Sequence, residues 1–211
     1  MHDLVIRDAK IVDGSGAPAT HGDVAVDNGK IVQVNGAKVG PGKREINANG
    51  ALLTPGWVDV HTHYDGQATW DPYLSPSSWH GVTTAVMGNC GVGFAPVKPA
   101  MREWLIQLME GVEDIPNAAL AEGIDWQWET FPEYMDALER MPRALDIGCQ
   151  MPHGALRPYV MGENGIESTD ASAAEIDEMR RLTREALVAG ALGFSTSRTL
   201  IHKGADGKYV P

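Results

Sequence analysis

The chain has 211 residues, 43% of them hydrophobic and 21% charged, a composition typical of a globular protein rather than a disordered or fibrous one. Its formal net charge of −11 at pH 7 argues against nucleic acid and anionic membranes as partners. It has no apolar run near the roughly 18 residues that cross a bilayer, and its first residues do not resemble an export signal. Because its two cysteines do not suggest a disulfide framework, we expect free thiols and a cytoplasmic location.

Residues 1–54 have the pattern of a small β unit. The segments "DLVIRDAKIVDG" and "GDVAVDNGKIVQVNG" alternate apolar and polar residues and are separated by glycine-containing turns. In the second segment, Asp27, Asn28 and Gly29 stand between two alternating runs, and Asn and Gly both tolerate positive φ. We therefore predict a β-hairpin at this position.

Residues 55–211 have a different pattern, in which apolar strands alternate with helices. Strands are expected near 57–61, 83–88, 144–151 and 191–196. This alternation is typical of α/β proteins with a parallel sheet. A closed (β/α)₈ barrel takes about 250 residues, so four strands correspond to half of one. We therefore expect the chain to be truncated and to carry the first half of such a barrel.

The first helix is expected at "PAMREWLIQLMEG". Apolar residues recur at helical spacing from Met101 to Met109, and Gly111 is expected to end the helix. The roughly twenty residues that follow have no sustained period and contain Trp126 and Trp128. This long segment is either a functional lid or packing over the mouth of a barrel.

Two further helices carry clear start signals. Thr130 with Glu133, and Ser172 with Glu175, have the spacing of a capping box, in which each side chain bonds the backbone N–H of the other residue. Gly190 is expected to end the second of these helices. Both helices are interpreted as outer packing elements.

The stretch "PGWVDVHTHYD" carries the first candidate site. Its apolar start suggests a buried strand, in which His61 and His63 would leave the same face. Two neighbouring imidazoles on a rigid face can chelate a divalent cation. Two histidines that are each hydrogen-bonded in a loop are the alternative interpretation.

The second strand leads into "GNCGVGFAP". In a parallel β/α barrel the catalytic groups lie at the carboxyl ends of the strands, which places Cys90 at the same edge as the histidine pair. Gly88, Gly91 and Gly93 allow a tight turn around the thiol. Cys149 lies within the apolar third strand and is interpreted as an inert core residue.

These motifs resemble the N-acyl-D-amino-acid deacylase (D-aminoacylase) branch of the amidohydrolase superfamily. The resemblance rests on "DVHTHYD" followed by "GNCGVGFAP", and on the segments "DLVIRDAKIVDGSGAP" and "IDWQWETFPEYMDALE". It implies an amidohydrolase-type (β/α)₈ barrel, here from residue 55 to 211, with a small β-sandwich portion over residues 1–54.

The resemblance also implies a zinc site. Cys90 would join two histidines of later strands at a tightly held zinc, and His61 and His63 would lie at a second, weaker metal position. The later histidines, and an aspartate that acts as general acid/base, are expected beyond Pro211. Relatives that hydrolyse cyclic amides commonly carry a carboxylated lysine on the fourth strand, and "GALGFSTSR" has no lysine.

The implied reaction is hydrolysis of a linear amide. A thiolate and neutral imidazoles suit zinc, which polarises a carbonyl and activates water. The expected substrate is a small molecule, an N-acyl-D-amino acid that yields a carboxylate and a D-amino acid without an organic cofactor. A cyclic-amide hydrolase of the dihydroorotase or hydantoinase type and a non-catalytic metal-binding half-barrel are the alternatives, and the sequence leaves the oligomeric state open.

Three further residues are weaker candidates. His153, in a predicted loop after the third strand, could orient a ligand or pin the loop. Arg157 in the same loop, and Arg198 after the fourth strand, could bind a substrate carboxylate through two hydrogen bonds. With only part of the implied zinc ligands present, the 211-residue chain alone is expected to be inactive.

Overall fold

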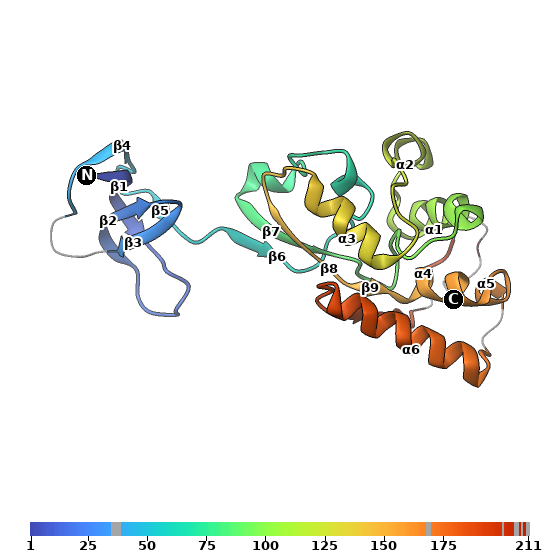
Figure 1. The fold of residues 1–211 in the computed structure, drawn as a ribbon. Coiled ribbons are helices and arrows are strands. Elements are labelled where there is room, and N and C mark those ends of the chain that lie inside the picture. The colour runs from blue at the N-terminus through green and yellow to red at the C-terminus, as the bar shows by residue number, and fades with distance from the viewer. Residues whose placement is uncertain (35–38, 168–169, 200, 205–206, 208, 210–211) are drawn as a thin grey trace. The chain divides into compact units, whose positions relative to one another are not determined.

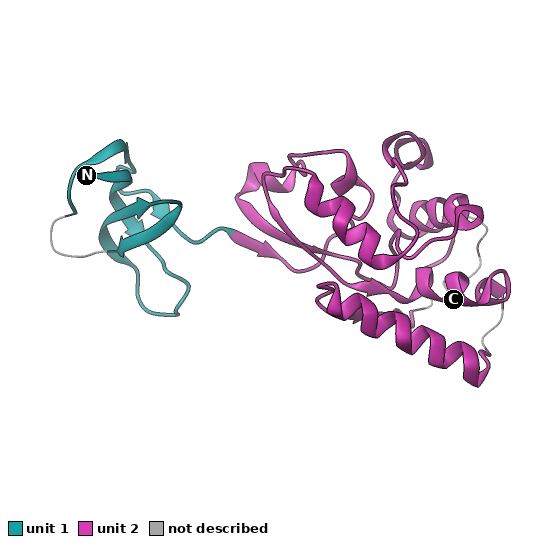
Figure 2. Ribbon diagram, viewed as in Figure 1, with its two compact units in different colours: residues 1–56 teal, residues 57–211 magenta. Residues whose placement is uncertain are grey.

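The computed structural model describes residues 1–34, 39–167, 170–199, 201–204, 207 and 209. The chain divides into two compact units, Met1–Gly56 and Trp57–Pro211, which Figure 2 shows in different colours. Each unit is described by itself. None of the described helices is long and apolar enough to cross a membrane.

The first unit is a five-stranded sheet in which β1 is central. The strand order is β3-β2-β1-β4, and β5 also pairs with β1. Neighbours β1, β2 and β3 pair antiparallel, whereas β4 and β5 run parallel to β1. The predicted hairpin is confirmed, since Asn28 and Gly29 take φ of 51° and 73° between β2 and β3. The strands are β1 (His2–Ile11), β2 (Thr20–Asp27), β3 (Lys30–Val34), β4 (Gly42–Asn47) and β5 (Leu52–Leu53).

The second unit is built on parallel strands whose neighbours follow the order of the chain (Figure 1). Strands β6, β7 and β8 form one parallel sheet, and β9 pairs in parallel with β10. Each of the four predicted strand regions contains a strand, which confirms the α/β class. The strands are β6 (Trp57–Asp59), β7 (Val82–Met87), β8 (Asp146–Cys149), β9 (Met151–Pro152) and β10 (Phe194–Ser195).

The strand next to the histidine pair differs from the expectation. We predicted a buried strand over 57–61, but β6 ends at Asp59, and Trp57 and Val58 are both 58% exposed. The described part of the chain pairs β6 on one side only, with β7. An apolar sequence alone cannot distinguish an edge strand from a central one.

The α-helices of this unit lie between β7 and β8 and between β9 and β10 in the chain, and they pack beside the strands (Figure 1). Helix α3 packs against α6, and α6 also contacts β9. The helices are α1 (Arg102–Glu113), α2 (Asn117–Gly123), α3 (Phe131–Arg140), α4 (His153–Met161), α5 (Asn164–Glu167) and α6 (Ala173–Val188), with 3₁₀ turns η1 (Gln67–Thr69), η2 (Ser77–His80) and η3 (Pro99–Met101).

Both predicted capping boxes are confirmed, at Thr130 and Glu133 before α3 and at Ser172 and Glu175 before α6. The expected end of the first helix is wrong. Helix α1 passes Gly111 and continues to Glu113. The next residue, Asp114, takes the left-handed conformation that ends the helix, with φ of 55°.

The long segment after α1 packs into the core and contains a helix that the sequence pattern did not predict. Helix α2 has a single buried residue, Leu120, which is too little for a visible apolar period. Trp128 is 4% exposed, and its indole Nε1 donates a hydrogen bond to the Phe94 carbonyl at 2.8 Å. Trp128 therefore belongs to the core rather than to a lid.

Candidate metal centre

The histidine pair lies in the loop that follows β6, not in the strand. Thr62 separates the two histidines and is buried, and its backbone N–H and hydroxyl both donate to the carbonyl of Val86 in β7, at 2.9 and 2.8 Å. His61 and His63 therefore leave the opposite side of the loop, with ring centroids 5.4 Å apart. The predicted shared face is present, although it depends on Thr62 anchoring the loop rather than on a strand.

Cys90 lies in a tight turn after β7. Its φ is 55°, and Gly88 and Gly91 on either side both take φ of 75°. A side chain at Gly88 would collide with the carbonyl oxygen of Gln150, and one at Gly91 would lie 3.1 Å from Cα of Thr196. The glycines thus let this turn lie directly against the segments that follow β8 and β10.

Asn89 connects this turn to its surroundings, a role that the sequence analysis missed. Its side-chain amide donates to the carbonyls of Thr62 at 3.2 Å and Val86 at 2.9 Å, and its Oδ1 accepts from Gln150 Nε2 at 2.7 Å. Asn89 is 7% exposed. One buried amide therefore holds the histidine loop, the cysteine turn and the end of β8 together.

The three predicted metal ligands converge. Nε2 of His61 lies 3.2 Å from Sγ of Cys90, and one ligand atom from each of His61, His63 and Cys90 lies within 4.8 Å of the other two. Zinc binds nitrogen and thiolate ligands at roughly 2.0–2.3 Å, so donors of one ion are separated by about twice that distance or less. The arrangement can hold a divalent cation with little rearrangement.

A carboxylate and a third histidine extend this group. Oε1 of Glu113 lies 3.2 Å from Nε2 of His63, and ligand atoms of Cys90, Glu113 and His202 also lie within 4.8 Å of one another. Neither Glu113 nor His202 was a sequence candidate. The expected helix end at Gly111 left Glu113 outside any predicted element, and His202 has no strand-end motif.

Burial shifts the protonation of the site toward neutral groups. The pKa of His63 is lowered to about 4, first by burial and then by repulsion from His61 and His202. Burial raises the pKa of the Cys90 thiol, with a further contribution from Glu113, and burial also raises the pKa of Glu113. A neutral imidazole can bind a metal ion directly. A divalent cation beside Cys90 and Glu113 would stabilise the negative charges of the thiolate and the carboxylate.

Asp65, two residues after His63, is a second group that the sequence analysis missed. Its side chain is 1% exposed, and within the described residues its Oδ2 has no hydrogen-bond partner. Burial raises the pKa of its carboxyl to about 7. A hydrogen bond from the backbone N–H of Gly88 lowers this pKa, but its effect is smaller than that of burial. Its backbone carbonyl accepts a hydrogen bond from the Tyr134 hydroxyl at 2.7 Å, which fixes the loop to α3.

None of the weaker candidates belongs to either ligand group. His153 and Arg157 were expected in a loop, but His153 begins α4 and Arg157 lies within that helix. Nδ1 of His153 is 3.3 Å from the Thr196 hydroxyl, and its pKa is lowered by burial and then by nearby Arg157 and Arg198. Arg157 is 7% exposed and donates to the carbonyl of Gly165 at 3.2 Å, whereas Arg198 is exposed.

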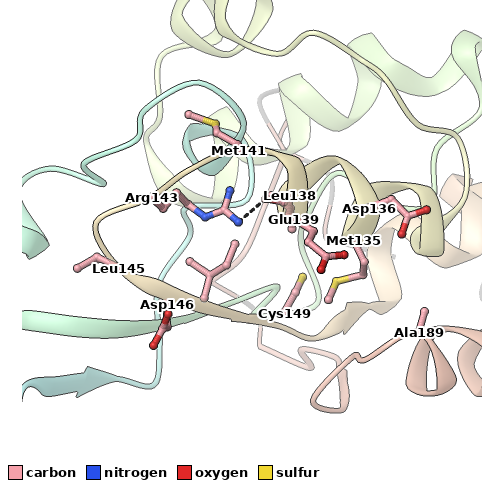
Figure 3. A pocket seen from close by; sticks show the side chains of 11 residues that line it. Met135, Asp136, Leu138, Glu139, Met141, Arg143, Leu145, Asp146, Cys149 and Ala189 are labelled. Atoms are coloured by element: carbon pink, nitrogen blue, oxygen red, sulfur yellow. Dashed lines mark hydrogen bonds between the residues drawn. The ribbon is translucent and has the colours of Figure 1, made fainter. Parts of the chain in front are cut away.

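A separate open cavity of about 580 Å³ lies between α3, the segment 141–147 and the residue after α6 (Figure 3). Cys149 lines it, and burial raises the pKa of this thiol well above its usual value, in agreement with its predicted inert role. The guanidinium of Arg143 there donates to the backbone carbonyl of Leu138. The cavity shares no lining residue with the metal-ligand groups.

Most of this chain is similar in sequence to curated relatives. It matches the model of the amidohydrolase family over residues 44–209. It is 37% identical over 194 residues to N-acyl-D-aspartate deacylase and 31% identical over 194 residues to D-aminoacylase, both of Alcaligenes xylosoxydans xylosoxydans. These matches cover 92% of this chain but 36% and 37% of the relatives. The chain therefore spans little more than a third of their length.

Solved structures agree with these matches. A crystal structure of D-aminoacylase has a TM-score of 0.76 at 31% identity, covering 93% of this chain and 38% of that one. N-acyl-D-glutamate deacylase from Bordetella bronchiseptica, complexed with zinc and a phosphonate inhibitor, has a TM-score of 0.75 at 31% identity, covering 92% and 38%. The chain belongs to the amidohydrolase family, and the resemblance to its D-aminoacylase branch is confirmed.

Proposed function

We propose that this chain supplies the first metal ligands of a zinc-dependent hydrolase that converts an N-acyl-D-amino acid and water to a carboxylate and a D-amino acid. The observation that carries the proposal is the convergence of His61, His63 and Cys90 within 4.8 Å at the ends of adjacent parallel strands. The relatives' names support the substrate class, since they specify deacylation of N-acyl-D-aspartate and N-acyl-D-glutamate.

The finer architecture is part of the same proposal. Residues 1–54 would form the β-sandwich portion and residues 55–211 the first half of a (β/α)₈ barrel. The parallel order from β6 to β10 supports this arrangement. We also propose that the protein is cytoplasmic. The two cysteines of the chain form no disulfide, which is compatible with a reducing compartment.

The site's own residues would hold and position the metal. His61, His63 and Cys90 would be its ligands, and Asn89 keeps their two loops in register through hydrogen bonds to Thr62 and Val86. Zinc, when bound, supplies a Lewis acid that polarises the amide carbonyl and acidifies water. The low pKa of His63, about 4, keeps its imidazole neutral at physiological pH.

The proposal is tested by removing Cys90 from the longest natural form of the protein. Cys90→Ala should abolish zinc-dependent deacylation, with a milder loss for His61→Ala and His63→Ala if these hold the weaker metal. Cys149→Ala is the matched control, since this buried thiol lies outside the ligand groups. Zinc content and turnover of N-acyl-D-amino acids, hydantoins and dihydroorotate would be measured. Unchanged deacylation by Cys90→Ala would contradict the proposal, and preference for a cyclic amide would favour the alternative activity.

A further inference from the structure

Ser195 bridges the turn that carries Cys90. It is the last residue of β10, and it is 8% exposed. Its Oγ accepts a hydrogen bond from the backbone N–H of Gly91 at 3.1 Å and donates one to the carbonyl of Gly88. One buried hydroxyl from β10 therefore binds the backbone on both sides of the cysteine.

This bridge and a direct hydrogen bond together determine the path of the turn. Gly88 and Gly91 have the spacing of the first and fourth residues of a β-turn, where the carbonyl of one often accepts from the N–H of the other. Here both groups bond to Oγ of Ser195. The overlapping turn over 89–92 is closed directly, since the N–H of Val92 donates to the carbonyl of Asn89 at 2.9 Å. Cys90 lies within both segments.

Cys90 needs this support because its backbone conformation is unfavourable. Its φ of 55° lies in the left-handed region, which disfavours a residue with a Cβ atom. Such a conformation persists only where the surrounding contacts determine it. Gly88 and Gly91 are both buried, so loss of the Ser195 hydroxyl would take a hydrogen bond from a buried carbonyl and from a buried N–H. The turn would then relax, and the Cβ of Cys90 would move with it.

The direction of the Cys90 side chain decides whether its thiol meets the histidine pair. Sγ of Cys90 lies 3.2 Å from Nε2 of His61, which comes from a different loop. A functional site requires its ligand atoms to be held within about 0.5 Å of their productive positions. Ser195 bonds the backbone of the turn, so it acts on the thiol through the position of Cys90.

We propose that Ser195 is a positioning residue of the metal centre, which directs the Cys90 thiolate toward His61 and His63 by bridging the backbone on both sides of it. The inference deepens the proposed function and rests on its metal centre. Ser195 is in register with Pro152 in the parallel pair of β9 and β10, so the bridge ties the turn to a paired strand. Hydrogen bonds that orient metal ligands typically change metal affinity by about 10–100-fold.

Zinc affinity of the longest natural form of the protein tests this role. Ser195→Ala removes the hydroxyl with little change in volume and should weaken zinc binding by about tenfold or more. Ser195→Thr keeps a hydroxyl and should retain most of the affinity. Thr69→Ala is the matched control, because the Thr69 hydroxyl also donates to a backbone carbonyl, that of Gly66 at 2.8 Å. This control should bind zinc like the unsubstituted protein.

Cobalt binding separates positioning from a purely structural role. The metal-free proteins would be titrated with Co²⁺, and ultraviolet absorption would report the cobalt–thiolate bond, which should be weakened in Ser195→Ala alone. Urea denaturation would measure the stability of each variant. A Ser195→Ala protein that loses stability but keeps its zinc affinity and its cobalt–thiolate band would overturn the positioning role and leave the metal centre intact. Equal losses of zinc affinity in Ser195→Ala and Ser195→Thr would also overturn it, because packing rather than the hydroxyl would then matter.

A second measurement tests the bridge without any substitution. Residue-resolved hydrogen exchange of the metal-free protein should show slow exchange of the Gly91 N–H, because this group is buried and donates to Ser195. Exchange at the rate of an exposed amide would overturn the bridge. Failure of the unsubstituted protein to bind zinc or to show a cobalt–thiolate band would instead overturn the proposed function, and the positioning role with it.

Discussion

At the residue scale, the buried carboxyl of Asp65 should make the stability of the metal-free chain depend on pH. Burial raises its pKa from 3.8 to about 7 in the folded state. Between about pH 4 and pH 7 the unfolded chain releases a proton that the folded chain retains, so stability falls as pH rises through this window. The loss can reach about 4 kcal/mol, because one pKa unit corresponds to about 1.4 kcal/mol.

Asp65→Asn should remove that part of the pH dependence. The amide cannot ionise, so the urea midpoint of the variant should fall less between pH 4 and pH 8 than that of the unsubstituted chain, with a chelator present throughout. Asp71→Asn is the matched control, because hydrogen bonds from Gln67 and backbone N–H groups outweigh burial and lower the pKa of Asp71. That variant should lose stability above about pH 4. Equal pH profiles for Asp65→Asn and the unsubstituted chain would contradict the assignment.

The same scale shows which site residues a sequence can reveal. His61, His63 and Cys90 could be proposed as ligands because their residue types and their places after strands follow from local pattern, and the structure brings the three side chains together. Asn89 and Glu113 were missed because their roles depend on contacts across the fold, to Gln150 and to His63. A carboxylate at the end of a helix has no distinctive spacing, and only the packed structure shows that it faces a thiol.

At the element scale, the turn after β7 should tolerate no side chain at Gly88. An alanine there would combine a strained φ of 75° with a collision against the carbonyl of Gln150, in the short link between β8 and β9. Gly88→Ala should therefore cost more than about 3 kcal/mol of unfolding free energy and weaken metal binding at Cys90.

The matched control for this turn is Gly29→Ala. Gly29 also has a positive φ, 73°, but nothing lies within 4 Å of a side chain placed there. Urea denaturation compares the two variants, and the excess cost at Gly88 measures the contact with Gln150 apart from backbone strain. Equal losses of unfolding free energy for the two variants would show that Gly88 does not lie against the carbonyl of Gln150.

Element boundaries were predictable where the signal is local. The capping boxes at Thr130 and Ser172 fix helix starts by hydrogen bonds within four residues, so the sequence shows them directly. The end of α1 was misplaced because the helix continues through Gly111, and α4 was missed because its first residue, His153, follows a strand without a capping side chain. In both cases tertiary packing outweighs local propensity.

At the scale of the whole molecule, the parallel sheet of the second unit remains open within the described residues. Strand β6 pairs only with β7, and β10 pairs only with β9. His61 is exposed beside this open edge, whereas a hydrolase normally encloses its reacting groups and excludes bulk water. In the barrel that we propose, this edge would be paired with another strand, but residue patterns alone cannot show which strand that is.

The last prediction is that the 211-residue chain binds divalent metal but does not hydrolyse N-acyl amino acids at a measurable rate. Its donor groups are assembled, yet it spans little more than a third of the length of the deacylases it resembles, and the resemblance assigns none of its residues as the general acid/base. Without a positioned proton acceptor, general acid–base catalysis loses about 10²–10⁴-fold. Turnover of N-acyl-D-aspartate and N-acyl-D-glutamate would be measured on the zinc-loaded chain with and without chelator. Chelator-sensitive turnover that Cys90→Ala abolishes would show that the chain completes its own active site.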